Sequence, residues 1–208
     1  MDDQEATATD FGRPRAEQDA YFSVDVETDG PIPGEFNLLA FAIVEAGIHD
    51  GSRYRGPEEP EMGYWELKPV SDRFEADAMT ANRLDRADLA RRGSDPAEAM
   101  SRAAQWISQR SMGRRPVMVA SPIGFDWMFL HWYFVKYFGE SPFGHSSGFD
   151  LKTAISVRFD RPIAQSGRKN FPEWMGSKVQ HTHDARDDAT KQAQDFQAIR
   201  EWRGIAFE

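Results

Sequence analysis

The sequence predicts an α/β fold, in which a mixed sheet made of an antiparallel meander of three strands plus parallel strands is flanked by helices. Strand-like segments joined by short links occupy the chain up to residue 68, and helices alternate with short apolar strands after it. A content of 40% hydrophobic residues, with 15 Phe and 6 Trp among 208 residues, indicates a packed core. We expect one domain over residues 19–208, preceded by a disordered polar leader at 1–18.

The three strands of the meander differ in pattern. Residues 20–28 are rich in Tyr, Phe and Val and are stopped by an Asp-Gly-Pro turn. Residues 37–44 form an almost continuous apolar run, typical of a strand buried on both faces, and residues 63–68 alternate. Residues 50–62 between them have turn composition, so consecutive strands are expected to pair antiparallel.

The second half of the chain alternates helix and strand. Residues 77–92 have a mixed pattern, and Ser94-Asp-Pro-Ala-Glu98 is a typical helix start. The elements expected after it are a helix at 94–113, a strand at 116–120, a turn at 121–126, an aromatic helix at 127–138, a strand or helix start at 149–155, and a final helix at 183–202. Residues 158–180 are polar and rich in cations, and they are either an ordinary solvated loop or a segment that closes over a substrate.

Composition excludes several classes of protein. There is no Cys, so disulfides and thiolate metal sites are excluded. No run of about 18 apolar residues occurs, and the N-terminus has no signal-peptide pattern, so we expect a cytoplasmic protein without a membrane partner. The net charge of −9 argues against a broad nucleic-acid-binding surface but permits a small basic track beside an acidic metal site.

Two carboxylates, Asp25 and Glu27, lie in the first predicted strand. Residues two apart on a strand share a face, so the charges repel unless a cation such as Mg²⁺ compensates them. The plainer interpretation is a solvated strand end. A calcium-binding EF-hand loop is rejected because its last ligand position falls on Phe36, where the loop needs Glu.

Further acids and a histidine lie at the ends of later core elements. Asp126 follows a buried strand and a glycine turn, and His183 and Asp188 lie at the start of the final helix. Asp187 is expected on the solvated face of that helix. His181 competes with His183 as the functional histidine. The sequence therefore predicts one site assembled from three separated segments.

The order Asp25-x-Glu27, Asp126 in Gly-Phe-Asp, and His183-x-Ala185-x-x-Asp188-Ala189 resembles the DEDD exonuclease superfamily. It matches the histidine subclass, typified by the proofreading subunit of bacterial DNA polymerase, ribonuclease T and oligoribonuclease. The resemblance covers roughly residues 20–200. It implies a ribonuclease-H-like fold and 3′–5′ exonuclease activity that releases 5′-mononucleotides. Ser121-Pro122 stand where the family often has His-Asn, which places a neighbouring polar contact in doubt.

The resemblance also implies roles for these residues. Asp25, Glu27 and Asp188 would bind a metal ion that activates water, and Asp25 and Asp126 would hold a second. His183 would be the general base, and the ions would be Mg²⁺ or Mn²⁺. The residues expected to contact the terminal nucleotide are Thr28, Asp29, Gly30 and Phe36.

Alternatives remain at this level. A non-catalytic nucleic-acid-binding module on the same fold would not need all five site residues, and a structural divalent-ion domain would not cleave oligonucleotides. The substrate is single-stranded nucleic acid or a short oligonucleotide, with DNA and RNA both open because no contact to a 2′-hydroxyl is identified. Homodimers are common in the family that the sequence resembles, but the sequence reveals no interface.

Overall fold

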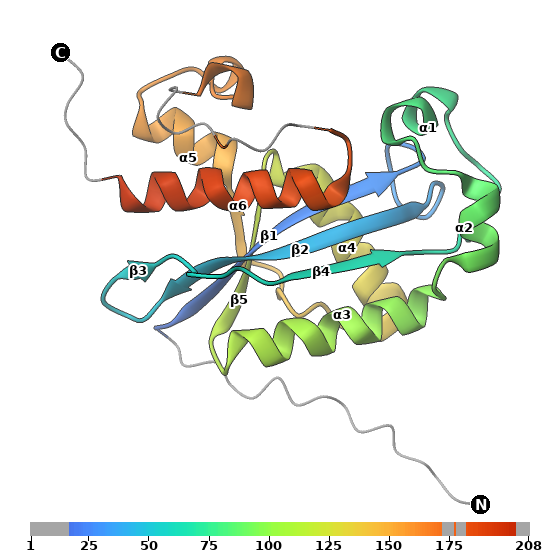
Figure 1. The fold of residues 1–208 in the computed structure, drawn as a ribbon, viewed down its shortest axis with the longest axis horizontal. Coiled ribbons are helices and arrows are strands. Elements are labelled where there is room, and N and C mark those ends of the chain that lie inside the picture. The colour runs from blue at the N-terminus through green and yellow to red at the C-terminus, as the bar shows by residue number, and fades with distance from the viewer. Residues whose placement is uncertain (1–16, 172–176, 178–181, 203–208) are drawn as a thin grey trace, which may run out of the picture.

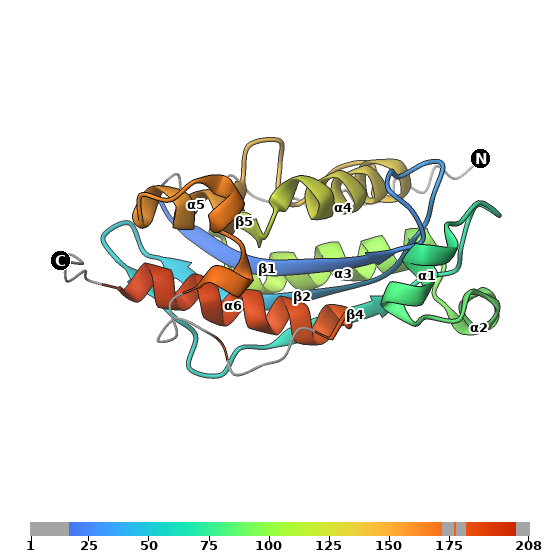
Figure 2. The same cartoon turned by 90° about the horizontal axis from the view of Figure 1, so that it is seen from above.

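The computed structural model describes residues 17–171, 177 and 182–202. In this part of the chain, helices cover both faces of a six-stranded sheet (Figures 1 and 2). The strands are β1 (Asp19–Thr28), β2 (Leu38–His49), β3 (Tyr54–Arg55), β4 (Met62–Glu66), β5 (Arg115–Ala120) and β6 (Gly148–Asp150). The helices are α1 (Ala76–Asn82), α2 (Arg86–Arg92), α3 (Pro96–Ser111), α4 (Ile123–Phe138), α5 (Leu151–Arg158) and α6 (Ala185–Glu201), with short 3₁₀ turns η1 (Ile163–Gln165) and η2 (Arg168–Asn170).

The sheet has the mixed topology that the sequence predicts. Its strand order is β3-β2-β1-β5-β6, and β4 also pairs with β2. The pairs β1–β2 and β2–β4 are antiparallel and form the meander, whereas β1–β5 and β5–β6 are parallel. The meander strands predicted at 20–28, 37–44 and 63–68 are thereby confirmed, although β2 continues to His49. Strand β1 lies in the middle of the sheet, between β2 and β5.

Alternate residues of β1 face the two sides of the sheet. Phe22 and Val24 belong to the core under α3 and α4, and Tyr21 packs in the other core, which α5 and α6 cover. Ser23 also faces α6, since its hydroxyl donates a hydrogen bond to the Ala189 carbonyl at 2.8 Å. The next residues of the same parity are Asp25 and Glu27. Both acidic side chains are therefore directed toward α6.

Helix α4 begins earlier than predicted. The turn expected at 121–126 covers only 121–122, because the helix starts at Ile123 and Asp126 lies in its first turn. The Ile123 N–H donates to the carboxylate of Asp150 at 2.8 Å, so a residue far along the chain satisfies the helix N-terminus. No residue beside Ile123 supplies this cap, which explains why the local sequence signalled a turn.

The other predicted elements differ only at their ends. Residues 149–155 are both strand and helix, because β6 ends at Asp150, whose carboxylate then caps α5 by accepting the Thr153 N–H at 2.6 Å. Helix α6 begins at Ala185, capped by Asp184, so His183 precedes the helix that was expected to include it. Residues 77–92 form α1 and α2.

Two predictions about the whole chain, the leader and the single domain, stay predictions. Residues 1–16 of the expected leader lie outside the described residues, and the single domain at 19–208 stays a prediction. Within the described ranges, none of the helices combines the length and the apolarity that crossing a bilayer requires.

Candidate active site

The site begins where β1 extends beyond its parallel neighbour. The last β1–β5 pair joins Ser23 to Val119, so the edge of β1 beyond Ser23 has no strand partner on that side. Asp126, from the first turn of α4, occupies this position and accepts the Val26 N–H through Oδ1 at 3.1 Å. A carboxylate of α4 therefore replaces the missing strand and is buried beside the acids of β1.

Helix α6 brings the third predicted segment to the same place. Gln192 donates through Nε2 to the Val24 carbonyl at 3.1 Å and to Asp25 Oδ1 at 3.2 Å. One turn earlier on α6, Asp188 is almost completely buried. Carboxylate oxygens of Asp25, Glu27 and Asp188 lie within 4.8 Å of one another.

The acidic cluster has strongly perturbed protonation. Burial, and then the charges of Asp126, Glu27 and Asp188, raises the pKa of Asp25 well above its usual value. Burial and the carboxylate of Asp188 raise the pKa of Glu27 to about 8. Burial also raises the pKa of Asp126 to about 7, against the opposing hydrogen bond from Val26. The ionised cluster requires a compensating cation.

This donor set fits a divalent metal ion. Mg²⁺ and Mn²⁺ are bound preferentially by oxygen ligands, and carboxylates supply both those ligands and the negative charge. Asp25, Glu27 and Asp188 present such oxygens close together on the described part of the chain. Asp126 lies beside them but outside this set of three, which suits a neighbouring ion or an indirect contact.

His183 precedes the last helix and shares a pocket with one of the acids, Glu27. It is exposed, adopts a left-handed backbone conformation with φ of 58°, and immediately precedes Asp184, the cap of α6. His183 and Glu27 both line a pocket of about 330 Å³. Its competitor, His181, lies outside the described residues. The structure thus brings together the predicted Asp25, Glu27, Asp126 and Asp188, and it places His183 in a pocket that Glu27 also lines.

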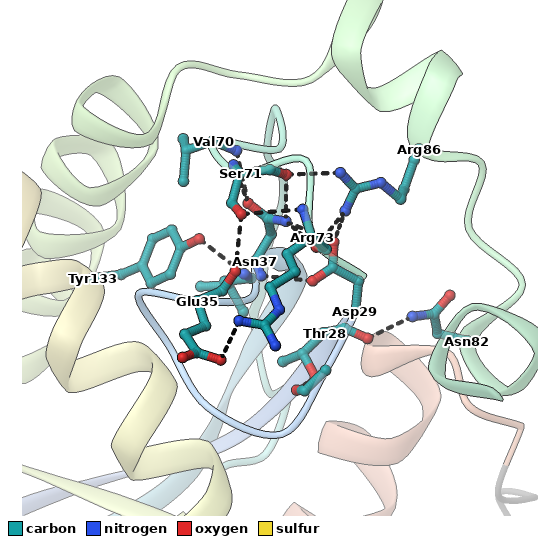
Figure 3. Close-up of polar contacts among 12 residues, drawn as sticks. Thr28, Asp29, Glu35, Asn37, Val70, Ser71, Arg73, Asn82, Arg86 and Tyr133 are labelled. Carbon is teal, nitrogen blue, oxygen red and sulfur yellow. Dashed lines mark hydrogen bonds and ion pairs between the residues drawn. The ribbon is translucent and has the colours of Figure 1, made fainter. Parts of the chain in front are cut away.

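Asp29, predicted to contact the substrate, has its polar groups bonded within the protein. Its side chain is fully buried, accepts hydrogen bonds from the Asn37 N–H at 2.6 Å and from Asn37 Nδ2 at 2.7 Å, and is paired with Arg86 (Figure 3). Its backbone N–H donates to the Asn37 carbonyl, and its carbonyl accepts the Glu75 N–H. Every polar group of Asp29 therefore has a protein partner, and its contact with the substrate stays a prediction.

The neighbouring residues of this turn are also closely packed. A Cβ on Gly30 would lie 2.1 Å from the Phe36 ring, so only glycine fits there. Phe36 itself is 7% exposed, and Thr28 donates its hydroxyl to the Gly30 carbonyl at 2.9 Å. Asn82 donates to the Thr28 carbonyl at 2.9 Å. Contacts of Thr28, Asp29, Gly30 and Phe36 with substrate remain predictions.

Two residues of the site were not identified from the sequence. Gln192 lies within the predicted final helix, and the available signal was a long polar side chain among small and apolar residues. Arg168, from η2, has its Nη1 atom 3.9 Å from Asp188 Oδ1. No local pattern distinguished it from the other cations of residues 158–180.

Fold and site together define a nuclease-type α/β protein, with an acidic cluster on the central strand of a ribonuclease-H-like sheet. No established family profile matches the sequence. A curated relative, the 3′-5′ DNA exonuclease Cap18 of Escherichia coli, is 33% identical over 192 residues, covering 89% of this chain and 94% of the relative. The chain belongs to the family of DEDD-type 3′–5′ exonucleases.

Solved structures agree with this fold. The nuclease domain of 3′hExo, described as a DEDDh family member bound to rAMP, superimposes with a TM-score of 0.62 at 9% identity over 88% of this chain and 90% of that one. Exonuclease I of Escherichia coli, solved with single-stranded DNA, gives 0.59 at 19% identity. That alignment covers 88% of this chain but only 40% of exonuclease I.

Proposed function

We propose that this 3′–5′ exonuclease hydrolyses single-stranded DNA, releases 5′-mononucleotides, and uses two divalent metal ions with His183 as the general base. The observation that carries the proposal is the convergence of Asp25, Glu27 and Asp188, whose carboxylate oxygens lie within 4.8 Å. The name of the curated relative, a DNA exonuclease, favours DNA over RNA as the substrate.

Each carboxylate has a distinct part in holding the ions. Asp25, Glu27 and Asp188 would bind one ion, and Asp25 with Asp126 would bind the other. Gln192 orients Asp25 through its 3.2 Å hydrogen bond, so the bridging carboxylate has a defined direction. Bound Mg²⁺ or Mn²⁺ would offset the charge that develops on the entering and leaving oxygens of the phosphodiester.

His183 suits the proton transfer. It is exposed at the rim of the site beside Glu27, so water reaches it. During hydrolysis the water oxygen forms a bond to phosphorus while the bond to the 3′-oxygen breaks. His183 takes the proton of the water, and the departing 3′-oxygen acquires a proton from solvent. Thr28, Gly30 and Phe36 are proposed to support the terminal nucleotide through the packed turn that they form.

The test is a titration of Mg²⁺ and Mn²⁺ with single-stranded DNA and RNA, each labelled at the 5′ or the 3′ end, for the wild type and His183→Ala. We expect metal-dependent shortening from the 3′ end of DNA, and a loss of roughly 100-fold or more in the variant, as is typical of a general base. Intact DNA with metal still bound would contradict the proposal and favour a binding module. Equal cleavage of RNA would contradict the choice of DNA.

A further inference from the structure

We propose that Arg168 is a catalytic residue whose guanidinium binds the phosphate of the scissile bond. The inference rests on the proposed function and assigns a further residue to the same site. Arg168 belongs to the polar segment between α5 and α6, and the proposal explains why this cation lies against the acidic cluster.

The position of Arg168 is built by the fold. Its Nη1 atom lies 3.9 Å from Asp188 Oδ1, and the two side chains are 19% and 2% exposed. The segment that carries it is folded on itself, because Arg161 donates through Nη1 to the Asn170 carbonyl at 2.9 Å. Ser166, just before it, is fully buried and donates to the Pro162 carbonyl at 3.0 Å. Arg168 is therefore directed at the cluster by a folded turn.

Charge balance indicates what Arg168 does when metal ions and substrate are bound. Without metal, its charge is attracted by the cluster, and it acts to lower the pKa of Asp25 and of Asp126. Two divalent ions would offset the four carboxylates, so Asp188 would no longer need the guanidinium. The charge that then requires a partner is the phosphodiester anion. A guanidinium presents a planar fork of N–H donors that matches two phosphate oxygens.

Another acid competes for the same guanidinium. Asp195 is fully buried on α6, and Arg168 also acts to lower its pKa. Asp195 has other partners, however, since its carboxylate lies 4.0 Å from Lys191 Nζ and accepts the Ser177 N–H at 3.3 Å. A purely structural role for Arg168, as a counter-ion of Asp188 or Asp195, is the alternative that an experiment must separate from phosphate binding.

The experiment compares Arg168→Ala with Lys169→Ala, an exposed cation in the next position. At saturating Mg²⁺, we expect Arg168→Ala to lose about 100-fold in kcat/KM on single-stranded DNA, the size typical of one removed donor to developing charge. Lys169→Ala is expected to stay within about threefold of the wild type, because solvent screens an exposed charge. A counter-ion replaced by metal would leave the activity of Arg168→Ala normal, which would overturn the assignment.

A binding measurement separates phosphate binding by Arg168 from a purely structural role, which would not change the result. In a His183→Ala background, the affinity for an oligothymidylate is compared with that for the same strand carrying a neutral methylphosphonate at the last linkage. The neutral linkage should weaken binding about tenfold more in this background than in the double variant that also carries Arg168→Ala, because the difference between the two penalties isolates the contact of the guanidinium with the anion. Equal penalties in the two proteins overturn the proposal.

Two further outcomes need their own controls: misfolding of Arg168→Ala, and failure of the proposed exonuclease function. If Arg168→Ala fails to fold, Arg168→Lys carries the test: about tenfold lower kcat/KM is expected because the charge stays but the fork is lost. Wild-type activity in Arg168→Lys would then overturn the assignment. If the wild type degrades no DNA with either metal, the proposed function fails; if the wild type is active and Arg168→Ala matches it, only the role of Arg168 fails.

Discussion

Asp29 and the pair Asp25 and Glu27 occupy the same strand end but have opposite surroundings. Asp29 is enclosed by Asn37 and Arg86, which give its carboxylate both hydrogen bonds and a positive charge. Asp25 and Glu27 instead face further carboxylates, and burial raises their pKa values. A buried acidic residue thus indicates a reactive site when other carboxylates surround it. It indicates a structural site when hydrogen-bond donors and a positive charge surround it.

The largest expected effect is the loss of activity when an acid of the cluster, Asp25, is replaced. Asp25→Asn should lower kcat/KM by roughly 10⁴-fold, about 5 kcal/mol of transition-state stabilisation, because a metal-binding charge is lost. The same variant should unfold at a higher temperature than the wild type in metal-free buffer, since it removes a repelled buried charge. Retained turnover in Asp25→Asn, measured on end-labelled DNA, would refute the site.

The second effect concerns stability rather than chemistry. Asp29→Ala should lower the free energy of unfolding by about 3–5 kcal/mol, because it leaves Arg86 without its buried partner. Urea denaturation measures the loss. A double variant, Asp29→Leu with Arg86→Leu, should recover part of it, since no unpaired charge remains. A loss below about 1 kcal/mol in Asp29→Ala would show that the pairing is not structural.

The third effect is a dependence on pH. The folded pKa of Glu27 is about 8 and that of Asp126 about 7, above the values of unfolded carboxyls, so the folded state holds more protons between about pH 4 and pH 8. The metal-free wild type should therefore lose stability, by several kcal/mol, as pH rises through this range. Mg²⁺ or Mn²⁺ should restore it, and more at pH 8 than at pH 5.

Melting temperatures with and without Mg²⁺ at pH 5 and pH 8 check this prediction. The sign follows from the ligands, because ions bind deprotonated carboxylates and so compete with protons at low pH. A stabilisation by Mg²⁺ that is the same at both pH values would argue against the raised carboxyl pKa values.

The smallest effect tests how Asp25 is oriented. Gln192→Leu removes the hydrogen bonds to Asp25 Oδ1 and to the Val24 carbonyl. The leucine that replaces the glutamine is apolar and of similar size. We expect about tenfold lower kcat/KM, at the lower end of the range for a partner of a metal ligand. Gln194→Leu, on the exposed side of α6, is the matched control and should keep wild-type kinetics. Equal kinetics in both variants would remove Gln192 from the site.

Much of the site follows from local rules. Strand parity alone places Asp25 and Glu27 on one face, and the spacing in the final helix brings Asp188 near His183. The helix start at Pro96 is likewise predicted from adjacent residues, because proline fits the first turn of a helix. These features are predictable because each depends on the geometry of neighbouring residues.

The features that were missed depend on distant residues. The start of α4 needs Asp150, the structural role of Asp29 needs Arg86, and the cation beside Asp188 is Arg168. No pattern near Ile123 or Asp29 contains these partners. Electrostatic compensation acts through space, so its partners become visible only after the chain has folded.

Neighbouring residues are enough to set the mixed sheet, the faces of its strands and the acids that meet at β1, since backbone periodicity and capping act over a few positions of the chain. Which of those acids remain uncompensated is settled by tertiary contacts alone. It depends on the segments that the sheet and α6 bring together, because the protonation and metal affinity of a buried carboxylate reflect the charges and hydrogen bonds within a few ångströms of it.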